Sequence, residues 1–430
     1  MRRLIGIVPA LVALLLAHGV VPLAALAQTP AVTGRGAHSL ASLEQLALER
    51  HPALKRAAAA VRAAAARKLQ AGLYPNPSIG YNAEEVSAGP IIRGGEHGVF
   101  GEQMIVTAGK LKKSEEVAAQ EETIKQREAE IERLRVLNGV RLYFYEALGA
   151  ERRVALREQL ARLTREAVGT TRELYNVGAA DQTDVLDAEV EAERAELVLM
   201  ETRNDQKRVW QQLAAAAGVA WLEMGPLAGS LETDLPRLEE DAALRALLAE
   251  SPELAMAEAG VAREESAVKR ARAEWIPDLA VRGGVRYNRE RLEAGGRPVG
   301  VEGFADIGVK LPIFDRNQGG IAAAQAEAER ARAEVDRLRL ALRARLGLAI
   351  REYRDASERV ERYEKNILPR AKKAAELYEA RFRQMAAAYP QVLIARRTQY
   401  QLEAEYVEAL VRMRSSAVRI RGMLVGDAKD

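Results

Sequence analysis

Histidine, aspartate, glutamate and arginine are the residues that could carry chemistry in this sequence, because its 430 residues include no cysteine. His38, His51 and His97 follow the apolar N-terminal stretch, and no two of them are three or four residues apart. A transition-metal site would normally present clustered histidine, cysteine or carboxylate ligands. The sequence therefore predicts no metal site and no cofactor. Without a defensible Ser/His/Asp arrangement or a nucleotide motif, it also argues against an enzyme.

The charge balance excludes a further class of protein. Lys and Arg total 64 and Asp and Glu total 61, which leaves a formal net charge of +3. A nucleic-acid binder would show a basic excess, so we expect no nucleic-acid partner. The carboxylates lie at helical spacings opposite Arg and Lys, as on solvated coiled-coil faces. The elements that position these charges are therefore expected to be long helices, which the low aromatic content of 5% also favours.

The N-terminus reads as an export signal. Arg2 and Arg3 precede an apolar run from Leu4 to Ala17, and Ala25-Leu26-Ala27 supplies a small-x-small cleavage pattern. A transmembrane anchor is the weaker alternative, because His18 and Pro22 interrupt a run that is already short of the ~20 residues that a spanning helix needs. We predict cleavage after Ala27 and export of the remaining chain.

Proline positions indicate where long helices can form. No proline lies between Pro90 and Pro226 or between Pro312 and Pro369, and a proline inside a helix costs about 3 kcal/mol. Both stretches are rich in strong helix formers, in Lys110–Gly149 and in Ile321–Ile350. Their apolar residues follow heptad-like spacings with charged flanks, which predicts coiled-coil packing.

Short segments between these stretches alternate with a period of two and predict strands. Apolar and polar residues alternate in Ser78–Glu84, in Asp278–Asn288 and in Phe304–Leu311. A fourth segment, Val99–Ile105, alternates poorly and is assigned as a strand by analogy with the others.

The chain repeats one plan twice. Ser39–Gly218 and Arg237–Leu424 each read as helix, two strands, long helix, turn and long helix, at an offset of 200 to 208 residues. The predicted division is a signal peptide at 1–27, a first repeat at 28–218, a linker at 219–236, a second repeat at 237–424 and a tail at 425–430.

Four strands of about ten residues could span an outer membrane but could not close a barrel, which needs at least ~8 strands. An open edge in lipid would leave backbone groups unpaired, so the chain would have to borrow strands from copies of itself. The alternative is a soluble periplasmic coiled-coil protein with a small β domain. Tyr74 and Trp275 lie at equivalent strand entries and favour the membrane reading, because Tyr and Trp are enriched at membrane interfaces.

Three motifs resemble those of the TolC outer-membrane efflux family: YPNPSIGY from Tyr74, LYNVGAADQTDVLDAE from Leu174 and LPIFDRNQGGIAAA from Leu311. The resemblance covers roughly Ser39 to Leu424 and is nearest to the heavy-metal-exporter branch of CzcC-type proteins. It implies a mainly α fold with a transmembrane β-barrel portion. Four strands per chain would complete a 12-stranded barrel in a homotrimer, and long coiled-coil helices would continue it as a periplasmic α-barrel.

The same resemblance implies an outer-membrane location in a Gram-negative bacterium, contact with outer-membrane lipid, and two protein partners. These are a periplasmic membrane-fusion adaptor and an inner-membrane pump of the RND type. The implied function is passive conduction of substrates, heavy-metal cations first, to the exterior. The alternatives are a channel for drug export or type I protein secretion, or a soluble periplasmic scaffold.

Two departures from the family pattern bear on this expectation. Gln28 stands where many members carry a lipid-modified cysteine, so we expect no lipidation. The family often carries an acidic pair at the periplasmic tip of the second repeat, where this chain has Gln391 and Ile394. Asp184 and Asp187 occupy the equivalent places in the first repeat and share one helical face. They could form a negative constriction in a trimer, or simply an acidic helix start.

The remaining candidate residues fall into two groups. The helix-reversing turns would form adaptor-docking tips, or they are ordinary hairpin turns; they contain Gly178, Ala179, Ala180, Asp181, Ala386, Ala387 and Tyr389. Charges on the polar strand faces would line a lumen, because a lipid-facing charge costs ~2–4 kcal/mol at the bilayer midplane. These residues are Glu84, Arg282, Arg286, Asp306 and Lys310.

Overall fold

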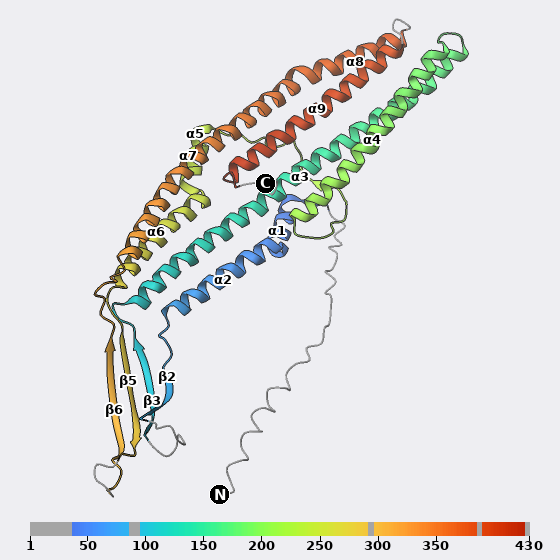
Figure 1. Cartoon of the computed structure of the whole chain (residues 1–430). Coiled ribbons are helices and arrows are strands. Elements are labelled where there is room, and N and C mark those ends of the chain that lie inside the picture. The colour runs from blue at the N-terminus through green and yellow to red at the C-terminus, as the bar shows by residue number, and fades with distance from the viewer. Residues whose placement is uncertain (1–36, 86–94, 291–295, 385–388, 426–430) are drawn as a thin grey trace, which may run out of the picture.

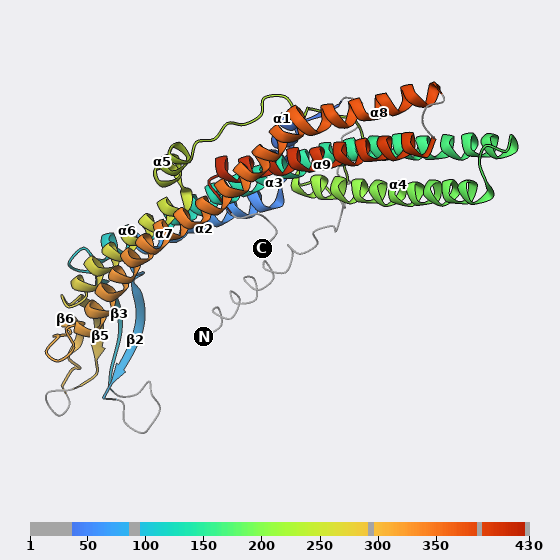
Figure 2. The same cartoon turned by 90° about the horizontal axis from the view of Figure 1, so that it is seen from above.

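The computed structural model describes residues 37–85, 95–290, 296–384 and 389–425; the predicted leader at 1–27 and the turn residues Ala386 and Ala387 lie outside these ranges. The molecule is elongated, with a four-stranded sheet at one end and two helical hairpins reaching the other (Figure 1). Seen from above, the helices bend between the sheet and the hairpin ends, and α9 runs beside α3 (Figure 2).

Both halves of the chain present the same order of elements. The first half contains α1 (Leu40–Arg50), α2 (Pro52–Gly72), β2 (Ser78–Glu84), β3 (Glu96–Ile105), α3 (Lys110–Asn176) and α4 (Gln182–Ala216). The second contains α5 (Glu240–Glu250), α6 (Pro252–Ala273), β5 (Leu279–Asn288), β6 (Gly300–Val309), α7 (Gln318–Arg362), the π-helical turn η1 (Tyr363–Ile367), α8 (Leu368–Arg383) and α9 (Tyr389–Arg421).

The long helices predicted from the proline-free stretches are confirmed. α3 has 67 residues, which corresponds to about 100 Å at 1.5 Å per residue. α7 continues through η1 into α8, although Pro369 lies near the start of α8. Because proline cannot donate the helical backbone hydrogen bond, a wider π turn just before it lets the helix proceed.

Helix starts are encoded locally and equivalently in the two halves. His51 caps α2 and Ser251 caps α6, each followed by a proline at the first helical position. Gly109 and Asn317 precede α3 and α7 with φ of 65° and 57°, a left-handed conformation that glycine and asparagine tolerate best.

The hydrophobic core lies where helices of both halves meet, midway along the molecule. Its most deeply buried side chains come from six helices: Leu43 of α1, Val140 of α3, Leu213 of α4, Leu247 of α5, Leu342 of α7 and Leu410 of α9. None of the helices in the described ranges has an apolar stretch long enough to cross a bilayer.

The segment between the halves is held against the helices. Its short strand β4 (Leu227–Ala228) pairs in parallel with β1 (His38–Ser39). Trp210 of α4 donates its indole N–H to the carbonyl of Leu222 at 2.9 Å. Arg414 of α9 donates hydrogen bonds to the backbone carbonyls of Leu231, Thr233 and Asp234. The crossing segment is therefore fixed by side chains from both halves.

The four longer strands form one antiparallel sheet in the order β2-β3-β5-β6. All four predicted strands are confirmed, including β3, whose sequence alternates poorly. β3 and β5 join the two halves, with Phe100 opposite Gly284. The outer strands β2 and β6 have no partner on their second side in the described part of the chain.

Candidate functional site

The two faces of the four-stranded sheet differ in chemistry. One face carries five carboxylates and two arginines; we call it the charged face, and its ionisable residues are Glu84, Glu96, Glu102, Arg282, Arg286, Glu302 and Asp306. The register makes Arg282 the cross-strand neighbour of Glu102 and Asp306. Four of the five residues predicted to line a lumen are thus on one surface.

Lys310 is the exception, because β6 ends at Val309. Pro312 follows shortly after and has no backbone N–H with which to extend a strand ladder. Lys310 therefore lies beyond the sheet, next to the strand-to-helix turn, and not on the charged face.

Arg286 is the centre of the ion pairs on the charged face. Its guanidinium lies 2.6 Å from Glu96, 3.2 Å from Glu302 and 3.6 Å from Glu84. The amide of Asn288 donates a second hydrogen bond to Glu96 at 2.8 Å. The sequence placed Glu84 and Arg286 on polar strand faces, but the other two partners of Arg286, Glu96 and Glu302, were not singled out, because they become its neighbours only through strand pairing.

The opposite face is apolar and exposed to an unusual degree. Ile79, Val301 and Ile307 have 88%, 74% and 75% of their surface accessible, and Tyr81, Val99 and Val285 on the same face are also more than half exposed. A contiguous exposed apolar surface marks a region that contacts a membrane or another protein. A sheet with one charged and one exposed apolar face fits a wall between water and lipid.

The junction between sheet and helices is fixed by Asp278, just before β5. Its carboxylate accepts hydrogen bonds from the backbone N–H of Thr107 at 2.8 Å and from the buried ammonium of Lys110 at 3.0 Å. Tyr74 and Trp275, the predicted interface aromatics, lie at this same end of the sheet and are 68% and 51% exposed.

The α3–α4 turn shows how the first hairpin reverses. Gly178 has a φ of 74°, which only glycine adopts without strain, and no atom lies within 4 Å of the position of a Cβ there. Asp181 caps α4, and its own backbone N–H donates to the Asp184 carboxylate at 3.0 Å. Asp184 thus has a local role in a capping box, while Asp187 lies exposed one turn further along α4.

The second hairpin differs at its corresponding positions. Tyr389 begins α9, so it lies in the helix and not in the turn. Burial raises the pKa of the Tyr389 hydroxyl, with a hydrogen bond from Thr170 opposing this effect. Gln391 lines a shallow groove between α8 and α9 together with Tyr378 and Ile394.

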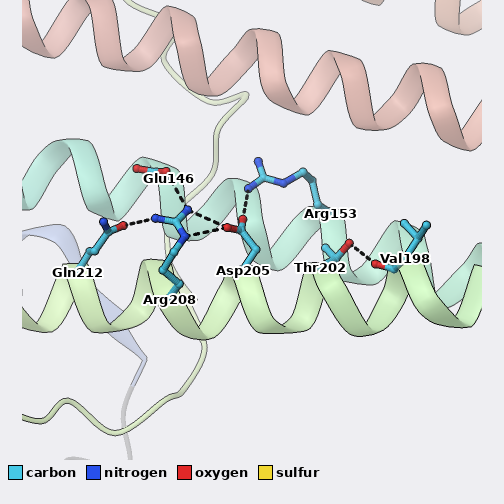
Figure 3. A network of polar contacts seen from close by, with 7 residues as sticks. All are labelled: Glu146, Arg153, Val198, Thr202, Asp205, Arg208 and Gln212. Atoms are coloured by element: carbon cyan, nitrogen blue, oxygen red, sulfur yellow. Dashed lines mark hydrogen bonds and ion pairs between the residues drawn. The ribbon is translucent and has the colours of Figure 1, made fainter.

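Clustered charges elsewhere form ion pairs between helices. In Figure 3, Asp205 of α4 lies between Arg153 of α3 and Arg208 of its own helix, and Arg208 also approaches Glu146. Each acid in this network faces an arginine, as expected for packed coiled-coil surfaces. Within the described ranges, no group of three or more potential ligands could hold a metal ion.

Comparison with known proteins identifies the family. The family model of the outer membrane efflux protein matches residues 43–219 and 243–426, most of the chain. The cobalt-zinc-cadmium resistance protein CzcC of Cupriavidus metallidurans is 27% identical over 281 residues. That match spans 65% of this chain and 65% of CzcC, slightly less than two thirds of either protein.

Solved structures share the fold. CusC, studied for folding and transmembrane channel formation, superposes with a TM-score of 0.73 at 14% identity over 90% of this chain and 92% of its own. The MtrE outer membrane channel of Neisseria gonorrhoeae in its open state gives 0.72 at 18% identity, over 91% of each chain. VceC of Vibrio cholerae gives 0.71 at 18%, over 90% of this chain and 96% of its own. With the family model matching both halves, this chain belongs to the outer membrane efflux protein family.

Proposed function

We propose that this protein is a passive, trimeric outer-membrane channel of a tripartite efflux system. The four-stranded sheet carries this proposal. It has a charged face and an exposed apolar face, and each of its two outer strands lacks a second neighbour among the described residues. It stands at the end of long helices, of which α3 is about 100 Å long. The chain is proposed to carry no catalytic chemistry and no resident cofactor, so the energy for transport would come from a partner.

Closure of the sheet requires copies of the same chain. β2 and β6 run antiparallel to each other across the sheet, so β6 of one chain can pair with β2 of the next and continue the same alternation. Three copies supply 12 strands, which is above the ~8 needed for a barrel. The charged face would line the lumen, because charges facing lipid cost ~2–4 kcal/mol at midplane. Tyr74 and Trp275 would lie at the periplasmic membrane interface.

The helices would continue the barrel as a tunnel across the periplasm. Their hairpin ends lie furthest from the sheet (Figure 1), so the tips would meet a periplasmic adaptor, and through it an RND-type pump in the inner membrane. The docking residues proposed for the described part of the tips are Gly178, Ala179, Ala180, Asp181 and Tyr389. The two repeats and the linker keep the boundaries given above, and the leader would be cleaved after Ala27 without lipidation.

The proposed cargo is a heavy-metal cation. The name of CzcC supports this, as does the excess of five carboxylates over two arginines on the charged face, which would favour cations in a lumen. Organic drugs or secreted proteins are the alternative cargo. Deletion of the gene should sensitise cells to cobalt, zinc or cadmium salts; sensitisation to drugs alone would contradict the metal assignment.

A constriction at the tip is proposed for Asp184 and Asp187, with Gln391 from the second repeat. Three copies of the two exposed aspartates would converge on the tunnel axis and attract cations. The test is Asp184→Asn with Asp187→Asn in a reconstituted channel, with Glu201→Gln on the exposed surface of α4 as a matched control. Cation preference that is unchanged in the double variant would leave Asp184 with its capping role alone.

The decisive experiment examines the full-length protein in outer membranes. We expect a trimer on an SDS gel of unheated sample that becomes a monomer on heating, and ion-conducting steps when the purified trimer enters a planar lipid bilayer. A monomeric protein that partitions with the soluble periplasmic fraction would instead support the scaffold alternative.

A further inference from the structure

Two glycine–phenylalanine pairs lie at equivalent places midway along the strands. Gly80 is opposite Phe100, and Gly284 is opposite Phe304. The members of the second pair follow those of the first by 204 residues each. Phe100 is also opposite Gly284, so a single row across the four strands contains Gly80, Phe100, Gly284 and Phe304 in that order. All four residues point to the charged face.

Each ring occupies the space that its glycine leaves free. A Cβ placed on Gly80 would lie 2.7 Å from Cε1 of Phe100, and one on Gly284 would lie 2.9 Å from two carbon atoms of Phe304. All of these distances are shorter than van der Waals contact, and a Cβ on Gly284 would also meet the backbone carbonyl oxygen of Val99. A larger residue at Gly80 would therefore displace the ring of Phe100, and one at Gly284 would disturb both the ring of Phe304 and the backbone of β3. The glycines therefore fix where the two rings lie on the charged face.

Arg282 extends from β5 between these rings. The central carbon of its guanidinium lies 3.8 Å from the ring centroid of Phe100 and 5.7 Å from that of Phe304, distances at which a cation is attracted to an aromatic face. Its Nε is buried and has no hydrogen-bond partner among the described residues. Although Glu102 and Asp306 are its cross-strand neighbours, the aromatic rings hold the guanidinium.

We propose that Phe100, Phe304 and Arg282 form a constriction inside the barrel lumen that selects what passes. The rings limit the size of a permeating solute, and the guanidinium weakens the preference for cations that the neighbouring carboxylates impose. This inference rests on the channel proposed above, because only closure of the barrel turns the charged face into a lumen.

Symmetry multiplies the effect of this cluster. Three copies would place six phenylalanine rings and three guanidinium groups around the middle of the barrel. A closed sheet of 12 strands, ~4.8 Å apart and tilted by ~40°, has a backbone diameter of only roughly 24 Å. Side chains of this size on all sides therefore decide the free width of the pore at that level.

The first test is the Phe100→Ala, Phe304→Ala double variant of the full-length trimer in planar bilayers. We expect single-channel conductance to rise roughly 1.5-fold, as the wider cross-section admits more ions, and larger neutral polyethylene glycols to enter the pore. Val99→Ala with Val285→Ala is the matched control, because these residues pair directly on the opposite, apolar face. If removing the rings prevents trimer assembly, Phe100→Leu with Phe304→Leu retains an apolar cover and should give a smaller increase.

The second test separates the charge of Arg282 from its stacking. Arg282→Met should shift the reversal potential in a salt gradient towards stronger cation selectivity, because Glu102 and Asp306 are then unopposed. Arg282→Lys should keep the wild-type potential. Unchanged conductance, polymer exclusion and reversal potential in heat-labile trimers would overturn the constriction while leaving the channel intact. A wild-type trimer that conducts no ions would overturn both proposals.

Discussion

Replacement of Arg414 by Met is expected to release the segment that joins the two halves. The Arg414 guanidinium donates hydrogen bonds to Leu231 O at 3.1 Å, to Asp234 O at 3.1 Å and to Thr233 O. Arg414 is only 8% exposed, and its guanidinium also lies 5.3 Å from the ring of Tyr145. Methionine can fill much of the buried volume, but it cannot donate any of the three hydrogen bonds.

The size of the effect follows from the number of bonds and their charge. A hydrogen bond to a charged group contributes about 1.5–3 kcal/mol, and bonds that share one guanidinium are not additive. We therefore assign about 3 kcal/mol to the whole interaction, near the value of two such bonds at the lower limit. Since about 1.4 kcal/mol is a factor of ten, the detached state of the segment should become roughly 100-fold more populated.

Limited trypsin digestion measures this population. Arg237 at the end of the segment is exposed, but the preceding Pro236 is buried, so cleavage after Arg237 requires the chain to detach. Where opening is fast, the cleavage rate follows the open population, and we expect a rate roughly 100-fold above wild type. Arg412→Met, which removes an exposed ion pair with Glu408 on the same helix, should leave the rate within about twofold. A rate for Arg414→Met equal to that of this control would refute the assignment.

Two further predictions concern the helices. Gly169→Ala in α3 should stabilise the protein by about 1 kcal/mol, because no atom lies near the new methyl group and alanine favours helix. Gly149→Ala in the same helix should destabilise the protein by about 1–3 kcal/mol, because its Cβ would overlap a methyl group of Val411. Thermal unfolding of both variants tests this contrast. The second prediction concerns the ion pair of Arg396 with Glu379, whose hydrogen bond lowers the pKa of Glu379 below its usual 4.5. The pair should therefore stabilise the α8–α9 hairpin above pH 4.5, and this stabilisation should be lost as the pH falls through the lowered pKa of Glu379 in the folded protein. Hydrogen exchange across the hairpin from pH 7 to 3 should show faster opening at the acidic end, and Arg396→Met should abolish this pH dependence.

The elements of this fold are readable from the sequence where the signal is local. Proline-free stretches with heptad spacing mark α3 and α7, and alternation marks β2, β5 and β6. β3 escapes the same criterion because glycines occupy both of its faces, with Gly98 among the charged residues and Gly101 on the apolar side. Only pairing with β2 and β5 shows which residues of β3 share a face, since a glycine has no side chain whose polarity would indicate its face.

The candidate site was readable only in part, because its contacts join distant segments. Alternation assigns Arg286 to a polar face, yet its ion pairs with Glu96 and Glu302 depend on strand register, which no single strand specifies. The two glycine–phenylalanine pairs carried a usable signal, an identical offset of 204 residues, but only the register shows that they share one level.

The same distinction separates local from long-range roles of the aspartates at the α3–α4 tip. Asp181 and Asp184 form a capping box that needs only four consecutive residues, so the start of α4 is encoded where it occurs. A constriction made of Asp184 and Asp187 would instead depend on where three chains place their hairpins around one axis. The Asp184 carboxylate already accepts a hydrogen bond from the backbone N–H of Asp181. A substitution of Asp184 would therefore change the cap of α4 as well as the charge of the proposed gate. Asp187, exposed and without that local role, is therefore the residue at which a change in cation preference would report the tunnel itself.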